Sequence, residues 1–424
     1  MNTSERDQRI IWHPYTQAKT ASPPLAVKRA SGAEIELEDG RTLIDGVSSW
    51  WVNLHGHSHP YIAEKVSAQL REIEHVIFAG FTHAPAVQLA ERLLAKLPKN
   101  QARVFFSDNG STAVEVALKM ALQYHRNTGD LKRTKLVAFE NGYHGDTFGT
   151  MSVSGKSAFT APFEPFLFPI ERIPAPETPA LLEQACEKLQ KLCASGTVAA
   201  FLYEPLIQGA GGMRMHSVDA LSHLLQIAQK SGTLLIADEV MTGFHRTGRF
   251  LASETATPPP DLICLSKGLT GGTLPMALTT CTSPIFEAFL SNEASHTFFH
   301  GHSYTGNPVG CAAALASLDL LEKPECQKAI QSLCEAQSAF MREIQEKHPV
   351  LSARTSGTVF SLDFQGQGYL DPLGPQLYRY FLEQGCLLRP LGNTVYLMPP
   401  YCTTASQLDH LQKTIREAIQ RFSR

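Results

Sequence analysis

From about position 103 onward, apolar residues fall into short continuous runs separated by segments with helical spacing. Five runs predict buried strands, at 103–106, 135–139, 198–203, 234–240 and 262–268. Residues 112–125 and 218–229 have the apolar spacing of helices. This alternation predicts an α/β domain with a mostly parallel sheet that helices cover on both faces.

The two ends of the chain follow other patterns. Residues 1–40 are expected to be irregular up to a hairpin, in which 33–38 and 41–47 flank Asp39-Gly40. Helical spacing is present over 60–74 and 86–97. Near the C-terminus, helices are predicted at 328–347 and 405–423, and strands at 359–364, 386–389 and 394–397. This last region indicates a smaller α+β unit.

Two of the predicted strands end in ionisable residues. The run at 234–240 contains Asp238, and the run at 262–268 contains Lys267. Ligands of open parallel sheets bind outside the carboxyl ends of the strands, so both side chains are expected to face one ligand. Pyridoxal phosphate suits such a pair, because it needs a lysine for its aldehyde and an acid for its ring nitrogen. The alternative is a helix-capping aspartate and a solvated lysine.

Composition limits the classes of function. A chain of 424 residues is long enough for two packed units, and a net charge of −3 argues against nucleic acid as a partner. Nine cysteines without a C-x-x-C pair favour reduced thiols. The polar N-terminus lacks a signal-peptide core, and no apolar run approaches the ~20 residues of a membrane span. We therefore expect a soluble, cytoplasmic protein that binds no membrane.

Two strand-end loops suit parts of a cofactor. The segment 105–113 predicts a strand, a polar turn and a helix start, where free amides and hydroxyls bind a phosphate. A plain N-cap at Ser111 or Thr112 is the alternative. The loop 141–147 places Tyr143 between glycines, where its ring is able to lie flat on a planar ligand. Local packing of that ring is equally compatible with the sequence.

A histidine cluster supports a different class of protein. His55, His57 and His59 alternate as they do in metal hydrolases. However, no second cluster with metal-ligand spacing follows, and Gly56 and Pro60 favour a turn. A structural loop is therefore expected here, with no metal.

The order of these motifs resembles the class III pyridoxal-phosphate aminotransferases. Besides the phosphate turn and the tyrosine loop, the matching strings are DEVMTGFHRTG at 238–248, KGL at 267–269 and HGHSYTGNP at 300–308. The resemblance covers nearly the whole chain. It implies the fold type I of pyridoxal-phosphate enzymes, with a seven-stranded sheet. The expected parts are an N-terminal segment at 1–55 contributing to the small domain and substrate pocket, a large cofactor-binding domain at 56–320 and a small α+β domain at 321–424.

Longer motifs are similar to one subgroup of that class. They are IWHPYT at 11–16, SSWW at 48–51, QGAGGMRM at 208–215 and YLMPPY at 396–401. The subgroup transfers the amino group of S-adenosyl-L-methionine to 8-amino-7-oxononanoate in biotin biosynthesis, giving 7,8-diaminononanoate by ping-pong kinetics. The alternatives are lysine as the donor, or a class III enzyme acting on another amine.

The resemblance also implies roles for single residues. Lys267 forms the Schiff base with pyridoxal phosphate, Asp238 pairs with its ring nitrogen, and Tyr143 stacks on the ring. Gly110 and Ser111 hold the phosphate, together with His302 and Ser303 from the partner subunit of a homodimer. Tyr15 is implied as catalytic beside Lys267 and Asp238. The implied substrate contacts are Tyr15, Trp50, Tyr143, Lys267, Gly301 and Arg389, with Arg389 on the carboxylate of the oxononanoate.

Three segments depart from the family pattern. His302-Ser303-Tyr304 stands where the family has Pro-Thr-Phe, so Ser303 keeps the hydroxyl that a phosphate needs, whereas the effect of His302 on its backbone contact stays open. His245 replaces a glycine, and Ser266-Lys267-Gly268 replaces Gly-Lys-Ala. Neither of these last two changes removes a reacting group.

Overall fold

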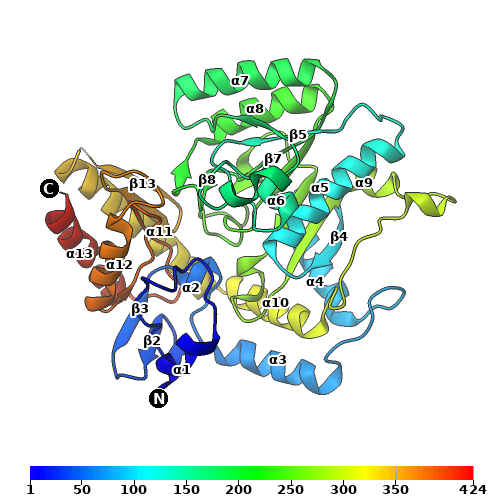
Figure 1. Cartoon of the computed structure of the whole chain (residues 1–424). Coiled ribbons are helices and arrows are strands. Elements are labelled where there is room, and N and C mark those ends of the chain that lie inside the picture. Colours follow the sequence, from blue (N-terminus) through cyan, green and yellow to red (C-terminus); the bar gives the residue numbers. More distant parts are fainter. Residues whose placement is uncertain (350, 424) are drawn as a thin grey trace.

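A seven-stranded sheet forms the centre of the computed structural model, which describes residues 1–349 and 351–423 (Figure 1). Its strand order is β4-β12-β11-β10-β7-β5-β6. The strands are β4 (Gln101–Ser107), β5 (Lys135–Phe139), β6 (Glu171–Ile173), β7 (Val198–Tyr203), β10 (Leu234–Asp238), β11 (Leu262–Leu265) and β12 (Ala277–Thr282). Strand β12 is antiparallel to both its neighbours, and the others run in one direction. The predicted mostly parallel sheet is confirmed.

Helices cover both faces of this sheet because successive residues of a strand point in opposite directions. On one face, Leu136 and Ile236 join a buried cluster with α5 (Gly110–Asn127). On the other, Val137 packs in a cluster with α7 (Pro179–Ala194) and α8 (Val218–Lys230). The two apolar layers explain why the strands appear in sequence as continuous apolar runs.

The remaining helices of this part pack beside the sheet. They are α3 (Pro60–Glu72), α4 (Ala84–Leu94), α6 (Phe148–Val153), α9 (Ser283–Glu287) and α10 (Pro308–Leu321), with short 3₁₀ turns at η1 (Ala161–Phe166), η2 (Ala252–Thr255), η3 (Lys267–Thr270) and η4 (Ala294–His296). Helix α10 is buried nearly all round, since α3, α4 and η3 lie against it. A two-stranded ribbon, β8 (Ile207–Gln208) with β9 (Arg214–Met215), projects toward the smaller part of the molecule.

Both ends of the chain build the smaller part, at the left of Figure 1. One sheet has the order β1-β2-β3-β15 and another the order β13-β14-β16. Their strands are β1 (Val27–Ser31), β2 (Glu34–Leu37), β3 (Thr42–Asp45), β13 (Ser352–Ser356), β14 (Val359–Asp363), β15 (Cys386–Leu387) and β16 (Thr394–Leu397). Helices α11 (Pro324–Lys347), α12 (Leu373–Glu383) and α13 (Ala405–Phe422) complete it. Ile44 in β3 pairs with Cys386 in β15.

The sequence prediction was wrong in several regions: no strand was predicted for β12, and the strand predicted at 262–268 ends at Leu265. Residues 1–40 are not irregular throughout, because α1 (Thr3–Ile10) and β1 form there. Helix α1 has no buried residue and is held by a capping box between Asn2 and Glu5, so no apolar periodicity marks it. The strand predicted at 386–389 ends at Leu387.

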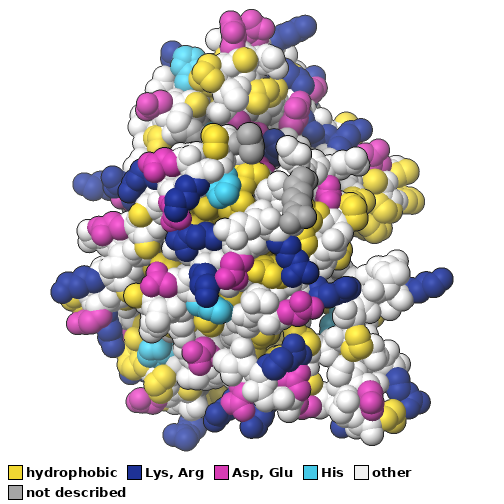
Figure 2. Space-filling model, turned by 90° about the vertical axis from the view of Figure 1, so that its left-hand side faces the viewer, with side chains coloured by type: hydrophobic (Ala, Val, Ile, Leu, Met, Phe, Trp, Pro, Cys, Tyr) yellow, Lys and Arg dark blue, Asp and Glu magenta, His cyan; other side chains and the backbone are white. Residues whose placement is uncertain are grey.

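Charges of both signs are interspersed on the face shown in Figure 2, with no broad single-sign patch. This distribution agrees with the small net charge of −3. Across 1–349 and 351–423, the structure contains no helix with the length and apolarity needed to traverse a bilayer.

Candidate active site

Asp238 and Lys267 lie together at the carboxyl edge of the seven-stranded sheet. Asp238 is the last residue of β10, and it pairs in register with Cys264 of the parallel neighbour β11. Lys267 follows β11 by two positions and opens the 3₁₀ turn η3. Both side chains line a cavity of about 490 Å³, which is within the range of small-molecule sites.

The N-terminus of α5 forms one wall of this cavity. Asn109 caps the helix by accepting a hydrogen bond from the Thr112 amide at 3.0 Å, and Gly110 and Ser111 line the cavity. A Cβ on Gly110 would lie 2.6 Å from Val240 Cγ1, so only glycine fits there. The 18-residue helix directs its positive end at this point, which suits a phosphate.

Asp238 has a buried partner that the sequence analysis did not assign. His144 Nδ1 lies 2.7 Å from Asp238 Oδ2, and the amide of Val240 donates to Asp238 Oδ1 at 3.1 Å. His144 follows Tyr143 in the loop after β5, so the same strand-end rule that selects Asp238 would have found it. The histidine fixes the orientation of the carboxylate and leaves it facing the cavity.

Lys267 is partly buried, and its Nζ lies 4.9 Å from the centre of the Trp51 ring. Burial lowers the pKa of Lys267, while the carboxylates of Asp238, Glu204 and Asp146 act in the opposite direction. A lysine with a lowered pKa is more often neutral, as a nucleophile or a proton carrier requires.

Tyr143 lines the cavity, and Tyr15 forms a second layer behind it, outside the lining. Their hydroxyls lie 3.0 Å apart, and Tyr15 also donates to the carboxylate of Asp146. Burial, followed by the hydrogen bond to Asp146, raises the pKa of Tyr15; burial and the bond to Tyr15 raise that of Tyr143. Both phenols therefore remain protonated and act as hydrogen-bonding groups.

Trp50 and Arg389 extend this layer. The Trp50 ring lies 5.5 Å from that of Tyr15, edge to face, and the Arg389 guanidinium lies 4.7 Å from the centre of the Trp50 ring. The fold thus brings together Tyr15, Trp50 and Arg389, which are far apart in the sequence. Arg389 forms no ion pair with an acidic side chain among residues 1–349 and 351–423, so its guanidinium is free for an anion.

The loop containing Gly301, His302 and Ser303 lies elsewhere. The carbonyl of Ser303 accepts a hydrogen bond from His75 Nε2 at 2.6 Å, and the amide of His302 donates to the Thr305 hydroxyl. None of the three lines the cavity of its own chain. The structure of a single chain therefore does not place these residues beside Lys267.

Glu204 is a further carboxylate of the cavity that the sequence analysis did not assign. It follows β7 directly, and it accepts hydrogen bonds from the amides of Tyr143 at 3.0 Å and Gly209 at 2.9 Å. Burial and the neighbouring charge of Asp238 raise the pKa of Glu204 to about 7, although His144 and the two amides lower it. Its position directly after a buried strand is the sequence feature that could have identified it as a site residue.

We expect Glu204→Gln to change how stability depends on pH. Unfolded, this carboxyl ionises near 4.5, and folded, near 7. Between these two pH values the folded chain holds a proton that the unfolded chain has released. The stability that this proton contributes is fully present below pH 4.5 and is lost as the pH rises to about 7. The free energy of unfolding falls by ~3 kcal/mol over this window, at ~1.4 kcal/mol per pKa unit. The variant lacks this loss, so its stability relative to the natural chain rises across that window.

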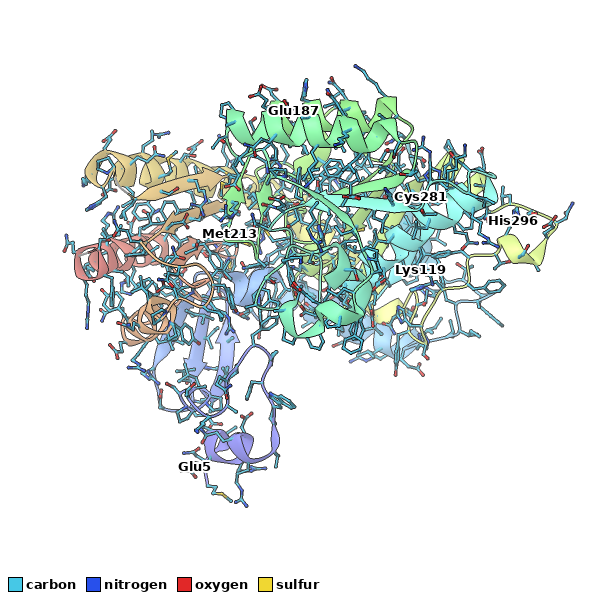
Figure 3. The ribbon with its side chains drawn as sticks, turned by 45° about the horizontal axis from the view of Figure 1, so that its top comes forward. Glu5, Lys119, Glu187, Met213, Cys281 and His296 are labelled. Atoms are coloured by element: carbon cyan, nitrogen blue, oxygen red, sulfur yellow. The ribbon has the colours of Figure 1, made fainter. Side chains whose placement is uncertain are left out.

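Urea unfolding of the cofactor-free protein from pH 4.5 to 8 measures this difference. Glu187→Gln, on the outer face of α7 (Figure 3), controls for the lost charge itself. A difference between Glu204→Gln and the natural chain that stays flat with pH contradicts the expectation.

The alternating histidines do not converge on one point. His55 Nε2 bonds the Ser317 hydroxyl at 3.0 Å, whereas His57 Nε2 lies 3.0 Å from Asp45 Oδ2. In the part of the chain that the structure describes, no group of three or more His, Cys, Asp or Glu side chains is arranged to hold a metal.

The cavity fits pyridoxal phosphate by the chemistry of its walls. It combines a lysine for an aldehyde, an acid for a ring nitrogen, a tyrosine beside the ring position and the N-terminus of a helix that begins at Gly110. Residues 15–419 match the family model of class III aminotransferases. The chain belongs to this family, as its motifs predicted.

Individual relatives are more specific. The chain is 50% identical over 419 residues to the adenosylmethionine-8-amino-7-oxononanoate aminotransferase of Synechococcus elongatus, covering 96% of this chain and 98% of the relative. The solved structure of the enzyme of that name from Methanocaldococcus jannaschii is 34% identical, with a TM-score of 0.94 over 99% of both chains. A pyridoxal-phosphate-bound amine transaminase from an uncultivated Pseudomonas species is 32% identical, with a TM-score of 0.90 over 97% of this chain and 99% of its own.

Proposed function

We propose that this chain is a pyridoxal-phosphate-dependent aminotransferase that moves the amino group of S-adenosyl-L-methionine onto 8-amino-7-oxononanoate. The product is 7,8-diaminononanoate, a biotin precursor. The observation that supports it most is the group of Tyr15, Trp50 and Arg389, which the 3.0 Å contact between the Tyr15 and Tyr143 hydroxyls joins to the cavity of Asp238 and Lys267. The names of the relatives at 50% and 34% identity agree with it.

When bound, pyridoxal phosphate supplies an electron sink for the carbon that gains or loses the amine. Lys267 would hold its aldehyde carbon, Asp238 its ring nitrogen, and Gly110 and Ser111 its phosphate. His144 keeps the Asp238 carboxylate oriented through the 2.7 Å contact. These assignments use the polar groups that already line the cavity.

Lys267 also moves the proton. Its lowered pKa lets the amine accept a proton from substrate carbon and return it, which is general base and then general acid catalysis. Trp51 lies beside Nζ and covers one side of this amine. The same residues serve donor and acceptor in turn, so the kinetics are ping-pong.

Arg389→Ala is expected to raise KM for 8-amino-7-oxononanoate by about ten- to a hundredfold, since a hydrogen bond to a charged group contributes ~1.5–3 kcal/mol. The kcat changes little, because the carboxylate lies away from the reacting carbon. Steady-state kinetics with the acceptor varied measure this. An unchanged KM removes Arg389 from the pocket, and Arg379→Ala, on helix α12, serves as the matched control.

Tyr143 lies between the Tyr15 hydroxyl and the cavity and would stack on the ring and touch substrate. We further propose a cytoplasmic homodimer in which Gly301, His302 and Ser303 of one subunit complete the substrate and phosphate sites of the other. The exposed position of Tyr304, 66% accessible, and the distance of this loop from its own cavity support that arrangement. Light scattering on the purified protein measures the oligomeric state.

The decisive experiment is an assay for 7,8-diaminononanoate with each donor separately. Product with S-adenosyl-L-methionine and none with lysine is expected. If the product forms only with lysine, lysine is the donor in place of S-adenosyl-L-methionine. Activity on ω-amines without any 7,8-diaminononanoate overturns the assignment.

A further inference from the structure

A strained turn carries both tryptophans that face the site. Ser48, Ser49, Trp50 and Trp51 have φ values of 50°, 44°, 80° and 73°. Four consecutive non-glycine residues in this left-handed region are rare, because Cβ approaches the neighbouring carbonyl. Such a turn persists only when the surrounding structure holds it.

The carboxylate of Asp45, which has no exposed surface, accepts three of the hydrogen bonds that hold this turn, beside backbone bonds such as that from the Trp51 amide to the Val47 carbonyl at 2.9 Å. Its Oδ1 accepts hydrogen bonds from the amides of Val47 at 3.1 Å and Ser49 at 3.0 Å. Its Oδ2 accepts from the Ser49 hydroxyl at 2.7 Å. Although burial raises the pKa of Asp45, these bonds and the one from His57 lower it below its usual value, so the carboxylate is charged.

His57 completes the arrangement from a different segment. Its Nε2 lies 3.0 Å from Asp45 Oδ2, and its Nδ1 lies 3.2 Å from the Asn53 side-chain amide. The tautomer with Nε2–H satisfies both contacts. The His57 backbone is tied to Gly32 by two hydrogen bonds, N–H to carbonyl at 2.7 and 3.2 Å. The ring is therefore anchored to the N-terminal hairpin.

The turn sets the direction of both indoles. Trp51 lies over Lys267 and donates through Nε1 to the Tyr396 hydroxyl at 2.9 Å. Trp50 faces the other way and contacts Tyr15 and Arg389. This turn is the short segment α2 (Ser48–Trp51), and Asp45 holds it at Ser49, directly before the two indoles, so the Asp45–His57 pair bears on both walls of the site.

We propose that Asp45 and His57 are a positioning pair: they hold the left-handed turn at 48–51 and thereby place Trp50 against the substrate wall and Trp51 against Lys267. Neither Asp45 nor His57 lines the cavity of Asp238 and Lys267. The proposal thus gives His57 a structural role, in a motif of alternating histidines that does not form a metal site among the described residues. The expected effect on KM rests on the proposed function, whereas the expected effect on the exposure of the tryptophans does not.

The structural test uses fluorescence. The chain has three tryptophans, so Trp12→Phe leaves only the emission of Trp50 and Trp51. In that background, His57→Leu is expected to raise acrylamide quenching at least twofold, because the turn relaxes and Trp51, now 4% exposed, meets solvent. His57→Gln keeps an N–H able to reach Asp45 and restores most of the protection. His59→Leu, in the same motif but without a contact to Asp45, leaves quenching unchanged.

The kinetic test uses the same holoenzymes without the Trp12 change. His57→Leu is expected to raise KM for the acceptor about tenfold or more with a smaller loss of kcat, while His57→Gln recovers KM. Thermal unfolding identifies any variant that has lost its fold. If His57→Leu is unfolded, His57→Gln is compared with the natural chain in its place. Unchanged quenching in a folded His57→Leu protein overturns the proposal. Changed quenching with no diaminononanoate activity in the natural chain overturns the proposed function alone.

Discussion

Lys267→Ala is expected to lower kcat by at least ~10⁴-fold, because proton transfer by a positioned side chain alone contributes about 10²–10⁴-fold. The variant also loses the covalent attachment of the cofactor and with it the yellow colour. No other amine is available in the cavity, because the described residues that line it include no lysine besides Lys267. Steady-state assays, visible spectra and mass measurement after borohydride reduction record these losses.

The natural chain is expected to gain the mass of a reduced cofactor adduct on Lys267, and the variant none. Lys132→Ala, at an exposed position before β5, controls for the loss of a lysine. Substantial turnover in Lys267→Ala, or an adduct on another lysine, contradicts the assignment of this site.

Asp238→Asn is expected to lower kcat by about 10²–10³-fold, the usual cost of removing one preorganised electrostatic contact. The neutral amide no longer favours a proton on the ring nitrogen, so the reacting carbon is less acidic. The shape of the side chain is kept, and the Val240 amide still has an acceptor. KM therefore changes less than kcat, as steady-state kinetics measure.

Asp261→Asn is the matched control for Asp238→Asn. Asp261 precedes β11 at the opposite edge of the sheet, and its carboxylate accepts a hydrogen bond from the Leu235 amide at 2.8 Å. The substitution is also aspartate to asparagine, but Asp261 does not line the cavity. Equal losses of kcat in both variants would indicate general damage to the sheet and contradict the role of Asp238.

The strands that the sequence predicts best are those with two buried faces. Predictions at 135–139, 198–203 and 394–397 coincide with the observed bounds of β5, β7 and β16. Strand β12 was missed because three of its six residues are threonines, which carry little apolar signal although the strand is buried. Strand order and the reversed direction of β12 depend on contacts between distant segments, which periodicity does not record.

The placement of Asp238 and Lys267 followed from one rule about the ends of parallel strands, and the structure brings them to one cavity. The layer of Tyr15, Trp50 and Arg389 was different. No local pattern links these positions, and only similarity to a family joined them. Glu204 and His144 satisfied the strand-end rule and were overlooked, whereas the role proposed for Asp45 depends on backbone angles that a sequence does not display.

The pairing of β3 with β15 has a consequence for the order of folding during synthesis. Ile44 leaves the ribosome more than three hundred residues before its partner Cys386. The seven-stranded sheet is complete at Thr282 and has its own apolar layers, so it is able to form first. The pairing of β3 with β15 must wait until residues 386–387 have been made. A nascent chain halted before β15 therefore lacks this support of the substrate wall and is expected to be catalytically silent.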